Sequence, residues 1–278
     1  MTWWAIDVRT AAGHRDSVGA WLVARTGQAV EERDDGTLVA FAPDKEAAAA
    51  LVEELGREVD APVVIEPRRV ESADWSTRWR EGLGPRKLGR LTIIPSWLPE
   101  AWEPDPFTIV LDPETAFGSG EHGSTRAALT LLSRLLRPGD RVLDLGSGSG
   151  ILAIAAIKLG ADRAIGIEID PEANEVAVRN AARNGVSDRV EFLDGDAATL
   201  APLVGPADLL LSNILRAVNT ALLPVIARTL RPGGFGIFSG MEQPEAEEFR
   251  RTLTDAGFKL VQETLDAGWW GVAAERPR

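Results

Sequence analysis

The second half of the chain alternates strand-like and helix-like segments, and this alternation limits the possible folds more than any other feature. Short apolar runs with the length of buried strands occur at 141–145, 163–169, 189–193, 207–212 and 234–239. Longer segments predict helices that begin at Ile151 and Pro171 or end near Leu230 and Ala256. Repeated strand–helix units form a parallel sheet with helices on both faces. We therefore predict an α/β domain.

The last two strand-like segments break this alternation. Residues 258–264 and 268–275 are joined by the short link LDAG, which has no room for a helix. The final strand is therefore predicted to be antiparallel in an otherwise parallel, Rossmann-like sheet. Trp269 and Trp270 fall on opposite sides of that strand, so we expect one in the core and the other at the mouth of a substrate site.

The start of the chain shows a different pattern. Strand-like and helix-like segments follow in the order βαββαβ, at 3–9, 13–27, 28–33, 37–43, 45–56 and 61–67. This order predicts a small ferredoxin-like α+β domain over 1–67. A connector is expected over 68–95, with Trp75 and Trp79 on one face of its helix, and the larger domain over 96–278.

Composition disfavours several classes of protein. The chain has no cysteine and only two histidines, far apart in sequence, so we expect no disulfide and no metal site. A net charge of −12 argues against direct nucleic-acid binding and suits a basic partner, although solubility alone also explains it. The first residues do not resemble a secretory leader, and no apolar run reaches the roughly 20 residues of a membrane span. We therefore expect a cytoplasmic protein without membrane contact.

Ligands of open α/β sheets bind at the carboxyl ends of the strands. Gly146 and Gly148 belong to a GSGSG turn that lets ligand atoms approach the backbone, and Glu168 follows Gly146 by 22 residues, at the end of the next strand. A carboxylate at this spacing binds the ribose of a nucleoside-containing cofactor. Ile151 stands where dinucleotide sites have a third glycine, and no lysine-containing phosphate loop occurs. These features favour S-adenosylmethionine.

Two further strand ends carry polar residues. Asp196 follows the third strand, where it can meet the adenine amino group, together with the backbone of Ala197, or cap the next helix. Asn213 ends the fourth strand at the position that faces the transferable methyl. Its amide can donate and accept hydrogen bonds. The next residues, 214–216, are Ile-Leu-Arg rather than the Pro-Pro-aromatic run common in enzymes that methylate planar nitrogens. A tetrahedral amine is therefore favoured as substrate, with alignment and desolvation driving the transfer.

Several segments together resemble a known family. The chain is similar to the bacterial methyltransferases of ribosomal protein eleven of the large subunit, which are class I S-adenosylmethionine enzymes. The similarity rests on DPETAFGSGEHGSTR, VLDLGSGSGILAIAAIKLGA, GIEIDPEANEVAVRNAARNGV, LLLSNIL and RPGGFGIFSG. It extends into the connector through DWSTRWREGL, whereas the N-terminal domain matches by layout alone.

The resemblance implies a cofactor site and a substrate. In this family the first glycine-rich segment is a loop that folds over the cofactor, and the turn after the first strand lies beneath it. Cofactor contacts would fall on Thr125 in the loop and on Gly146, Glu168 and Asn213, and Asn213 would also position the substrate amine. The implied reaction is methylation of lysine side chains and the N-terminal amine of ribosomal protein eleven, up to trimethylation. The N-terminal domain would recognise that protein, and we expect a monomer.

The chain departs from the usual family pattern at several positions. Ser119 and Ser124 replace threonines and keep the hydroxyl group. Glu168 replaces an aspartate and is one methylene longer. Residues 113–115 are Pro-Glu-Thr where a proline–glycine pair is usual, which questions the flexibility of the loop.

Other interpretations stay open. Asp170 is an alternative ribose partner, and His122 either lies over the cofactor or packs the loop. The chain could methylate a different protein, because substrate choice depends on the least-matched domain, or it could bind S-adenosylmethionine without transferring a methyl. A nicotinamide dehydrogenase is disfavoured by the GxGxG spacing and by the lack of a catalytic His or Tyr.

Overall fold

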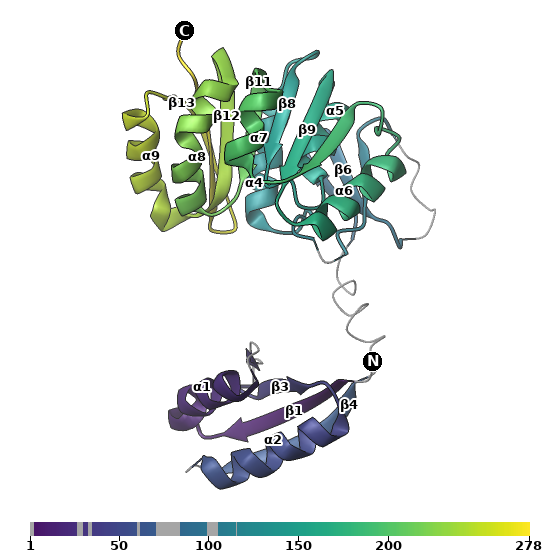
Figure 1. Ribbon diagram of the computed structural model, residues 1–278, viewed down its shortest axis with the longest axis vertical. Coiled ribbons are helices and arrows are strands. Elements are labelled where there is room, and N and C mark those ends of the chain that lie inside the picture. Colours follow the sequence, from purple (N-terminus) through teal and green to yellow (C-terminus); the bar gives the residue numbers. More distant parts are fainter. Residues whose placement is uncertain are drawn as a thin grey trace. The chain divides into compact units, whose positions relative to one another are not determined.

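The computed structural model describes residues 3–26, 30–32, 35–59, 62–70, 84–98, 105–114 and 116–278. The chain divides into two compact units, Met1–Leu83 and Gly84–Arg278 (Figure 1). Each unit has its own hydrophobic core. The expected connector helix with Trp75 and Trp79 lies outside the described residues.

The first unit is an antiparallel sheet packed against two helices. Its elements are β1 (Trp3–Thr10), a 3-10 turn (Ala12–His14), α1 (Arg15–Thr26), β2 (Glu31–Glu32), β3 (Leu38–Ala42), α2 (Lys45–Glu58) and β4 (Val63–Val70). The strands lie across the sheet in the order β2-β3-β1-β4, and neighbouring strands pair antiparallel. Along the chain the elements follow the predicted βαββαβ order, and the order across the sheet is that of a ferredoxin-like domain.

Helix α2 illustrates how the sequence of this unit produces its packing. The Asp44 carboxylate accepts a hydrogen bond from the Ala47 N–H at 2.7 Å and caps the first turn. Buried side chains at three- and four-residue spacing then join those of β1 in one core: Ala48, Leu51, Leu55, Ile6 and Val8. A helix with one apolar stripe can bury that stripe only against a partner, and the sheet supplies it.

The second unit contains a seven-stranded sheet in the order β10-β9-β8-β11-β12-β14-β13. Its strands are β8 (Arg141–Leu145), β9 (Arg163–Glu168), β10 (Val190–Asp194), β11 (Ala207–Asn213), β12 (Leu230–Glu242), β13 (Lys259–Asp266) and β14 (Trp269–Glu275). The first five pair parallel, whereas β14 is antiparallel to both β12 and β13. The predicted Rossmann-like sheet with an antiparallel end is confirmed. Strand order reverses between β8 and β11, which places the ligand crevice there.

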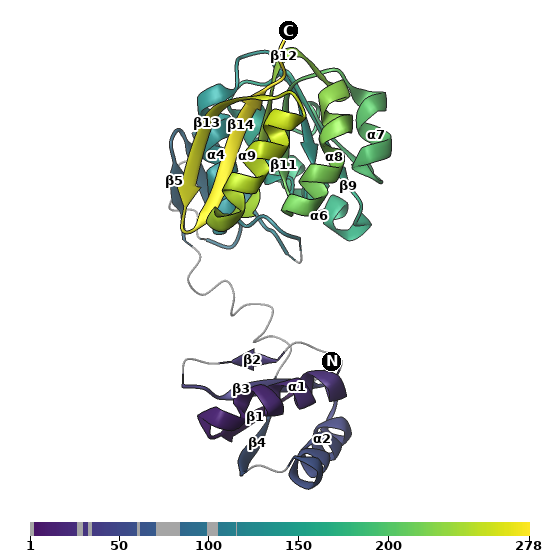
Figure 2. The same ribbon diagram turned by 90° about the vertical axis from the view of Figure 1, so that its left-hand side faces the viewer.

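Helices cover both faces of this sheet (Figure 2). One core lies under α4 (Gly123–Leu135), α5 (Ile151–Lys158) and α6 (Pro171–Arg183), and the other under α7 (Ala197–Val204), α8 (Arg216–Thr229) and α9 (Ala246–Asp255). Strand β11 serves both cores, because Leu209 and Leu211 join the first and Leu210 joins the second. None of the helices in the described part of the chain has the length and apolarity that crossing a bilayer requires.

The sequence interpretation missed several elements before β8. A small sheet contains β5 (Arg86–Leu88), β6 (Leu91–Pro95) and β7 (Thr108–Leu111). Helix α4 was also missed, although it packs on the sheet. Because α4 begins at Gly123, Thr125 lies in its first turn rather than in the preceding loop. The expected placement of Thr125 is corrected to that extent.

Candidate active site

A cavity of about 550 Å³ opens at the carboxyl ends of β8, β9, β10 and β11. Its volume lies in the range of small-molecule sites, and its wall is mostly apolar with a few polar groups. Five of the six residues predicted to bind cofactor line it: Gly146, Gly148, Glu168, Asp196 and Asn213. The sixth, Thr125, is fully buried and lies against Asn213. Sequence reasoning therefore located this cavity.

The glycine turn after β8 needs glycine for two reasons. Gly148 has a φ of +50°, in the left-handed region that side chains disfavour. A Cβ on Gly148 would also lie only 2.6 Å from the carbonyl oxygen of Phe117. The second reason was not foreseen, because it comes from the first glycine-rich segment rather than from a ligand.

The two glycine-rich segments contact each other directly through Ser149. The Ser149 N–H donates to the Phe117 carbonyl at 2.9 Å, and its hydroxyl donates to the Gly118 carbonyl at 2.6 Å. Ser149 is completely buried, whereas the Phe117 side chain lines the cavity. Both segments therefore contribute to one cavity wall, and hydrogen bonds hold them together.

Glu168 ends β9 and organises the backbone around it. One carboxylate oxygen accepts from the Gly148 N–H at 3.0 Å. The other accepts from the N–H groups of Ile169 at 2.9 Å and Asp170 at 3.2 Å. The Asp170 carboxylate instead caps α6 by accepting from the Glu172 N–H at 3.0 Å. Of these two carboxylates, Glu168 and not Asp170 lines the cavity.

Asp196 follows β10 and caps α7. Its carboxylate accepts from the Ala198 N–H at 3.0 Å, which is the helix-capping arrangement considered from the sequence. Asp196 and Ala197 also line the cavity. The cap accounts for the geometry of the carboxylate, and a contact with adenine stays a prediction.

Asn213 ends β11, and its side-chain amide uses its nitrogen in a hydrogen bond while its oxygen faces no donor among the described residues. Its Nδ2 donates to the Thr125 hydroxyl at 3.3 Å. Its Oδ1 is buried and has no hydrogen-bond partner among the described residues. A buried acceptor without a donor is costly, so this oxygen suits a ligand that brings an N–H. Thr125 therefore orients Asn213.

Asn219 supports Asn213 and was not found from the sequence. It is fully buried in α8, and its amide group donates to the carbonyls of Ile214 at 3.0 Å and Ser239 at 3.2 Å. Its Oδ1 accepts from the Ser212 hydroxyl at 2.6 Å. These bonds hold the residues on both sides of Asn213, through the Ser212 hydroxyl and the Ile214 carbonyl. An asparagine inside a helix has no local signal that would reveal this role.

An aromatic group lies at the cavity wall, made of Phe117, His122 and Trp269. The His122 ring lies 4.2 Å from that of Trp269 and 5.2 Å from that of Phe117, measured between centroids. Its Nδ1 is 2.7 Å from the Ser124 hydroxyl. Desolvation and the nearby Arg126 guanidinium lower the pKa of His122, so the ring is neutral at neutral pH. His122 thus packs the loop and lines the cavity at once.

The side chains of Trp269 and Trp270 lie on opposite sides of β14, as the strand alternation predicts. Trp270 is 3% exposed and belongs to the second core of the sheet, where its ring meets that of Phe249 edge to face. Trp269 lines the cavity. One tryptophan therefore stabilises the fold, and the other is available to a ligand.

Asp144 lies beneath the site in β8. It is completely buried and accepts from the Ala153 N–H at 3.2 Å. Burial raises the pKa of its carboxyl to about 7, and the negative charge of Glu168 adds to the rise. No cluster of three potential metal ligands occurs among the described residues.

Comparisons with known proteins agree with this geometry. The ribosomal protein L11 methyltransferase (PrmA) family matches residues 9–277. The ribosomal protein L11 methyltransferase of Thermus thermophilus is 40% identical over 211 residues, 76% of this chain and 81% of that protein. That of Pelotomaculum thermopropionicum is 37% identical over 244 residues, 87% of this chain and 79% of that protein.

A solved structure shows the same arrangement of elements. The crystal structure of the ribosomal protein L11 methylase from Lactobacillus delbrueckii subsp. bulgaricus superposes with a TM-score of 0.64 at 32% identity, covering 70% of this chain and all of that one. The family match begins within β1 and ends in the last residues of the chain, so it includes both units. The chain belongs to the ribosomal protein L11 methyltransferase (PrmA) family.

Proposed function

We propose that this chain methylates amines of ribosomal protein L11, on lysine side chains and at the N-terminus, with S-adenosylmethionine as methyl donor. The family is one of methyltransferases that depend on this cofactor. The observation that carries the proposal is the unpartnered Oδ1 of Asn213, on the wall of a cavity that Glu168 and the glycine turn also line. An acceptor beside a nucleoside-sized cavity fits an amine substrate.

The residues present fit S-adenosylmethionine. Glu168 has a carboxylate for the ribose hydroxyls, and Gly146 and Gly148 leave room for close approach to the backbone. Asp196 also lines the cavity, where its carboxylate would accept a hydrogen bond from the adenine amino group. When bound, the cofactor supplies a methyl group on a positively charged sulfur.

The protein's part in the reaction is to align and desolvate the amine. The Asn213 oxygen would accept an amine N–H and leave the nitrogen lone pair directed at the methyl carbon. Phe117 and Trp269 would exclude water around the nucleophile. The ammonium form of the amine would first lose a proton to water, and the free lone pair would then accept the methyl group that the bound cofactor supplies. The neutral ring of His122 would avoid repelling an ammonium group before it loses its proton.

Substrate recognition is proposed for the first unit. Residues 31–60 carry ten acidic and three basic side chains, which suits a lysine-rich protein. Residues 1–67 would form the recognition domain, 68–95 the connector and 96–278 the methyltransferase domain. We further propose that the protein works in the cytoplasm and as a monomer.

Intact-mass analysis tests the proposal. Purified ribosomal protein L11 is incubated with the chain and S-adenosylmethionine, with a matched reaction that lacks the cofactor. Successive single-methyl mass increments are expected, and peptide mapping then assigns them to amines. Cofactor binding without any increment would move the substrate to another protein or reduce the chain to a binding module.

A further inference from the structure

We name the first glycine-rich segment, residues 112–122, the cofactor loop. Helix α6 binds the first residue of this loop. Asn180 of α6 is completely buried and accepts from the Asp112 N–H at 3.1 Å. Its amide group donates at 3.0 Å to the carbonyls of Asp112 and Ser149. One side chain therefore joins the base of the cofactor loop to the glycine turn.

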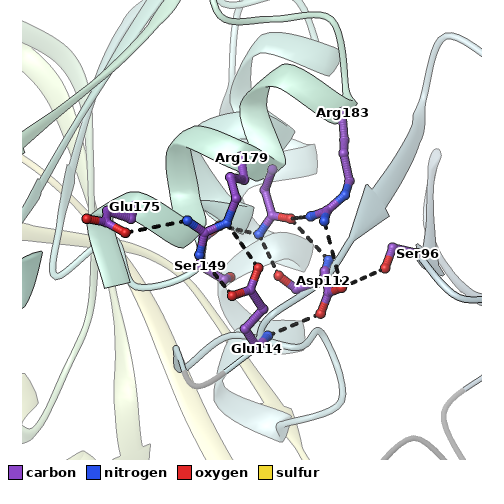
Figure 3. Close-up of polar contacts among 8 residues, drawn as sticks. Ser96, Asp112, Glu114, Ser149, Glu175, Arg179 and Arg183 are labelled. Atoms are coloured by element: carbon purple, nitrogen blue, oxygen red, sulfur yellow. Dashed lines mark hydrogen bonds and ion pairs between the residues drawn. The ribbon is translucent and has the colours of Figure 1, made fainter. Parts of the chain in front are cut away.

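The residue before Asn180 makes a second, more exposed connection (Figure 3). The Arg179 guanidinium binds both carboxylate oxygens of Glu114, with Nε to Oε1 at 3.1 Å and Nη2 to Oε2 at 2.8 Å. Arg179 also lies 3.6 Å from Glu175 on its own helix. The Glu114 contact is bidentate, the geometry in which an arginine best holds a carboxylate.

The backbone of Glu114 is strained where this contact forms. Its φ is +48°, in the left-handed region that favours glycine and disfavours a side chain such as glutamate. The Arg179 and Glu114 side chains are 44% and 36% exposed, so solvent weakens their attraction. The backbone strain and the ion pair oppose each other and are both small, which leaves the loop only weakly held at Glu114.

The position of Glu114 links it to the cavity. Phe117 follows by three residues, bonds Ser149 through its carbonyl and lines the cavity with its side chain. A change at Glu114 therefore reaches the wall of the proposed cofactor site through a few backbone bonds.

We propose that the Arg179–Glu114 ion pair is a latch that positions the cofactor loop and slows cofactor release. Arg179 and Glu114 are positioning residues, since they act through Phe117 and Ser149. The inference rests on the proposed function, because it assumes that the cavity holds S-adenosylmethionine. It assigns a role to Glu114, which lies where a proline–glycine pair is usual in the family.

The test compares two single variants and their charge exchange. Arg179→Gln and Glu114→Gln each remove the pair and keep the strained backbone, whereas Glu114→Arg combined with Arg179→Glu restores it in reverse. We expect S-adenosylhomocysteine to dissociate about three to ten times faster from the single variants, measured by stopped-flow tryptophan fluorescence. The exchange should return the rate toward that of the parent. The KM for S-adenosylmethionine should rise in the single variants, with kcat for L11 methylation changed less.

A second measurement needs no cofactor. Amide hydrogen exchange of residues 112–122 in the cofactor-free protein should speed up in both single variants. The matched control is Arg163→Gln, which removes an exposed pair with Glu191 at 2.8 Å, with side chains 54% and 50% exposed. Unchanged thermal unfolding would separate a local from a global effect.

The outcomes distinguish this inference from the proposed function. If Arg179→Gln and the control show the same dissociation rate and the same exchange in the cofactor loop, the latch does not exist, even if the parent chain methylates L11. If the parent chain does not bind S-adenosylmethionine, the proposed function and the latch fail together. Loss of the rate effect at high salt would support the ion pair as its cause.

Discussion

The residues at this site have different structural roles: some line the cavity, and others orient or hold those residues. Asn213 offers an acceptor, Thr125 orients its amide, and Asn219 holds the two residues beside it. Glu168 holds the glycine turn through the Gly148 N–H and lines the cavity. The substitutions with the clearest expected effects are therefore those that remove a single polar group.

Replacing Asn213 by alanine should separate chemistry from cofactor binding. Asn213→Ala removes the free acceptor, so the methylation rate should fall on the order of 100-fold, the usual cost of one positioned polar group at a reacting centre. The affinity for S-adenosylhomocysteine should change much less, because Glu168 and the glycine turn are untouched. Single-turnover methylation and titration calorimetry measure the two quantities. Wild-type methylation by this variant would refute the assignment of Asn213.

Asp144 should make the stability of the cofactor-free chain depend on pH. Its pKa is about 7 in the folded chain and about 4 when unfolded, so between these values the unfolded chain releases a proton that the folded chain retains. The free energy of unfolding should then fall as pH rises from 4 to 7, by on the order of 4 kcal/mol.

The variant Asp144→Asn removes this titration and keeps an acceptor for the Ala153 N–H. The stability difference between variant and parent should shift in favour of the variant as pH rises, measured by urea unfolding at pH 5 and pH 8. The exposed Asp188→Asn controls for buffer effects. A difference that stays constant with pH would contradict the burial argument.

At the scale of elements, the turn after β8 and the cofactor loop work as a pair. The N–H and hydroxyl of Ser149 hold the loop carbonyls, and Gly148 leaves the space that this contact needs. Helix α6 anchors the first residue of the loop, and α4 begins directly after its last residue. The geometry of the cavity wall therefore depends on several elements at once.

An alanine at Gly148 should separate the loop from the turn. Gly148→Ala places a Cβ 2.6 Å from the Phe117 carbonyl oxygen, so the loop must move and cofactor affinity should fall at least about tenfold. Gly185→Ala is the matched control, since Gly185 also has a positive φ, +63°, but a Cβ there meets nothing within 4 Å. Both variants should lose on the order of 1 kcal/mol of stability from backbone strain. Calorimetry with S-adenosylhomocysteine decides, and equal affinities would show that the contact is unimportant.

At the scale of the whole molecule, the chain consists of two bodies with separate cores. Ile6, Leu22 and Leu55 belong to the core of the first unit, whereas both cores of the large sheet lie in the second. Bodies that share no core can fold independently. The proposed division into recognition and catalysis follows this separation.

A fragment that starts at Gly84 should therefore keep the cofactor site and lose the substrate. We expect residues 84–278 to unfold cooperatively and to bind S-adenosylhomocysteine with the affinity of the whole chain. Methylation of L11 by this fragment should fall by on the order of 100-fold or more, because docking energy from the first unit is lost. The mass assay used for the full chain measures it. Undiminished methylation would move recognition to the second unit.

The sequence by itself determined the order of the strands from β8 onward, the parallel sheet with its antiparallel end, and the position of the cavity at the ends of the strands. These features follow from local period, from strand length and from residues at strand ends, which the topology of the sheet brings together. Gly146, Glu168 and Asn213 could be predicted because each directly follows or ends a strand.

Only the tertiary structure decided which polar groups pair. Thr125 and Asn213 are 88 residues apart, and Asn180 and Asp112 are 68 apart. Nothing local distinguishes Asn180 in its helix from an asparagine that faces water, and its role arises only when α6 packs against the cofactor loop. A hydrogen bond between distant residues exists because packing removes both groups from water, and the packing of whole elements settles which groups those are.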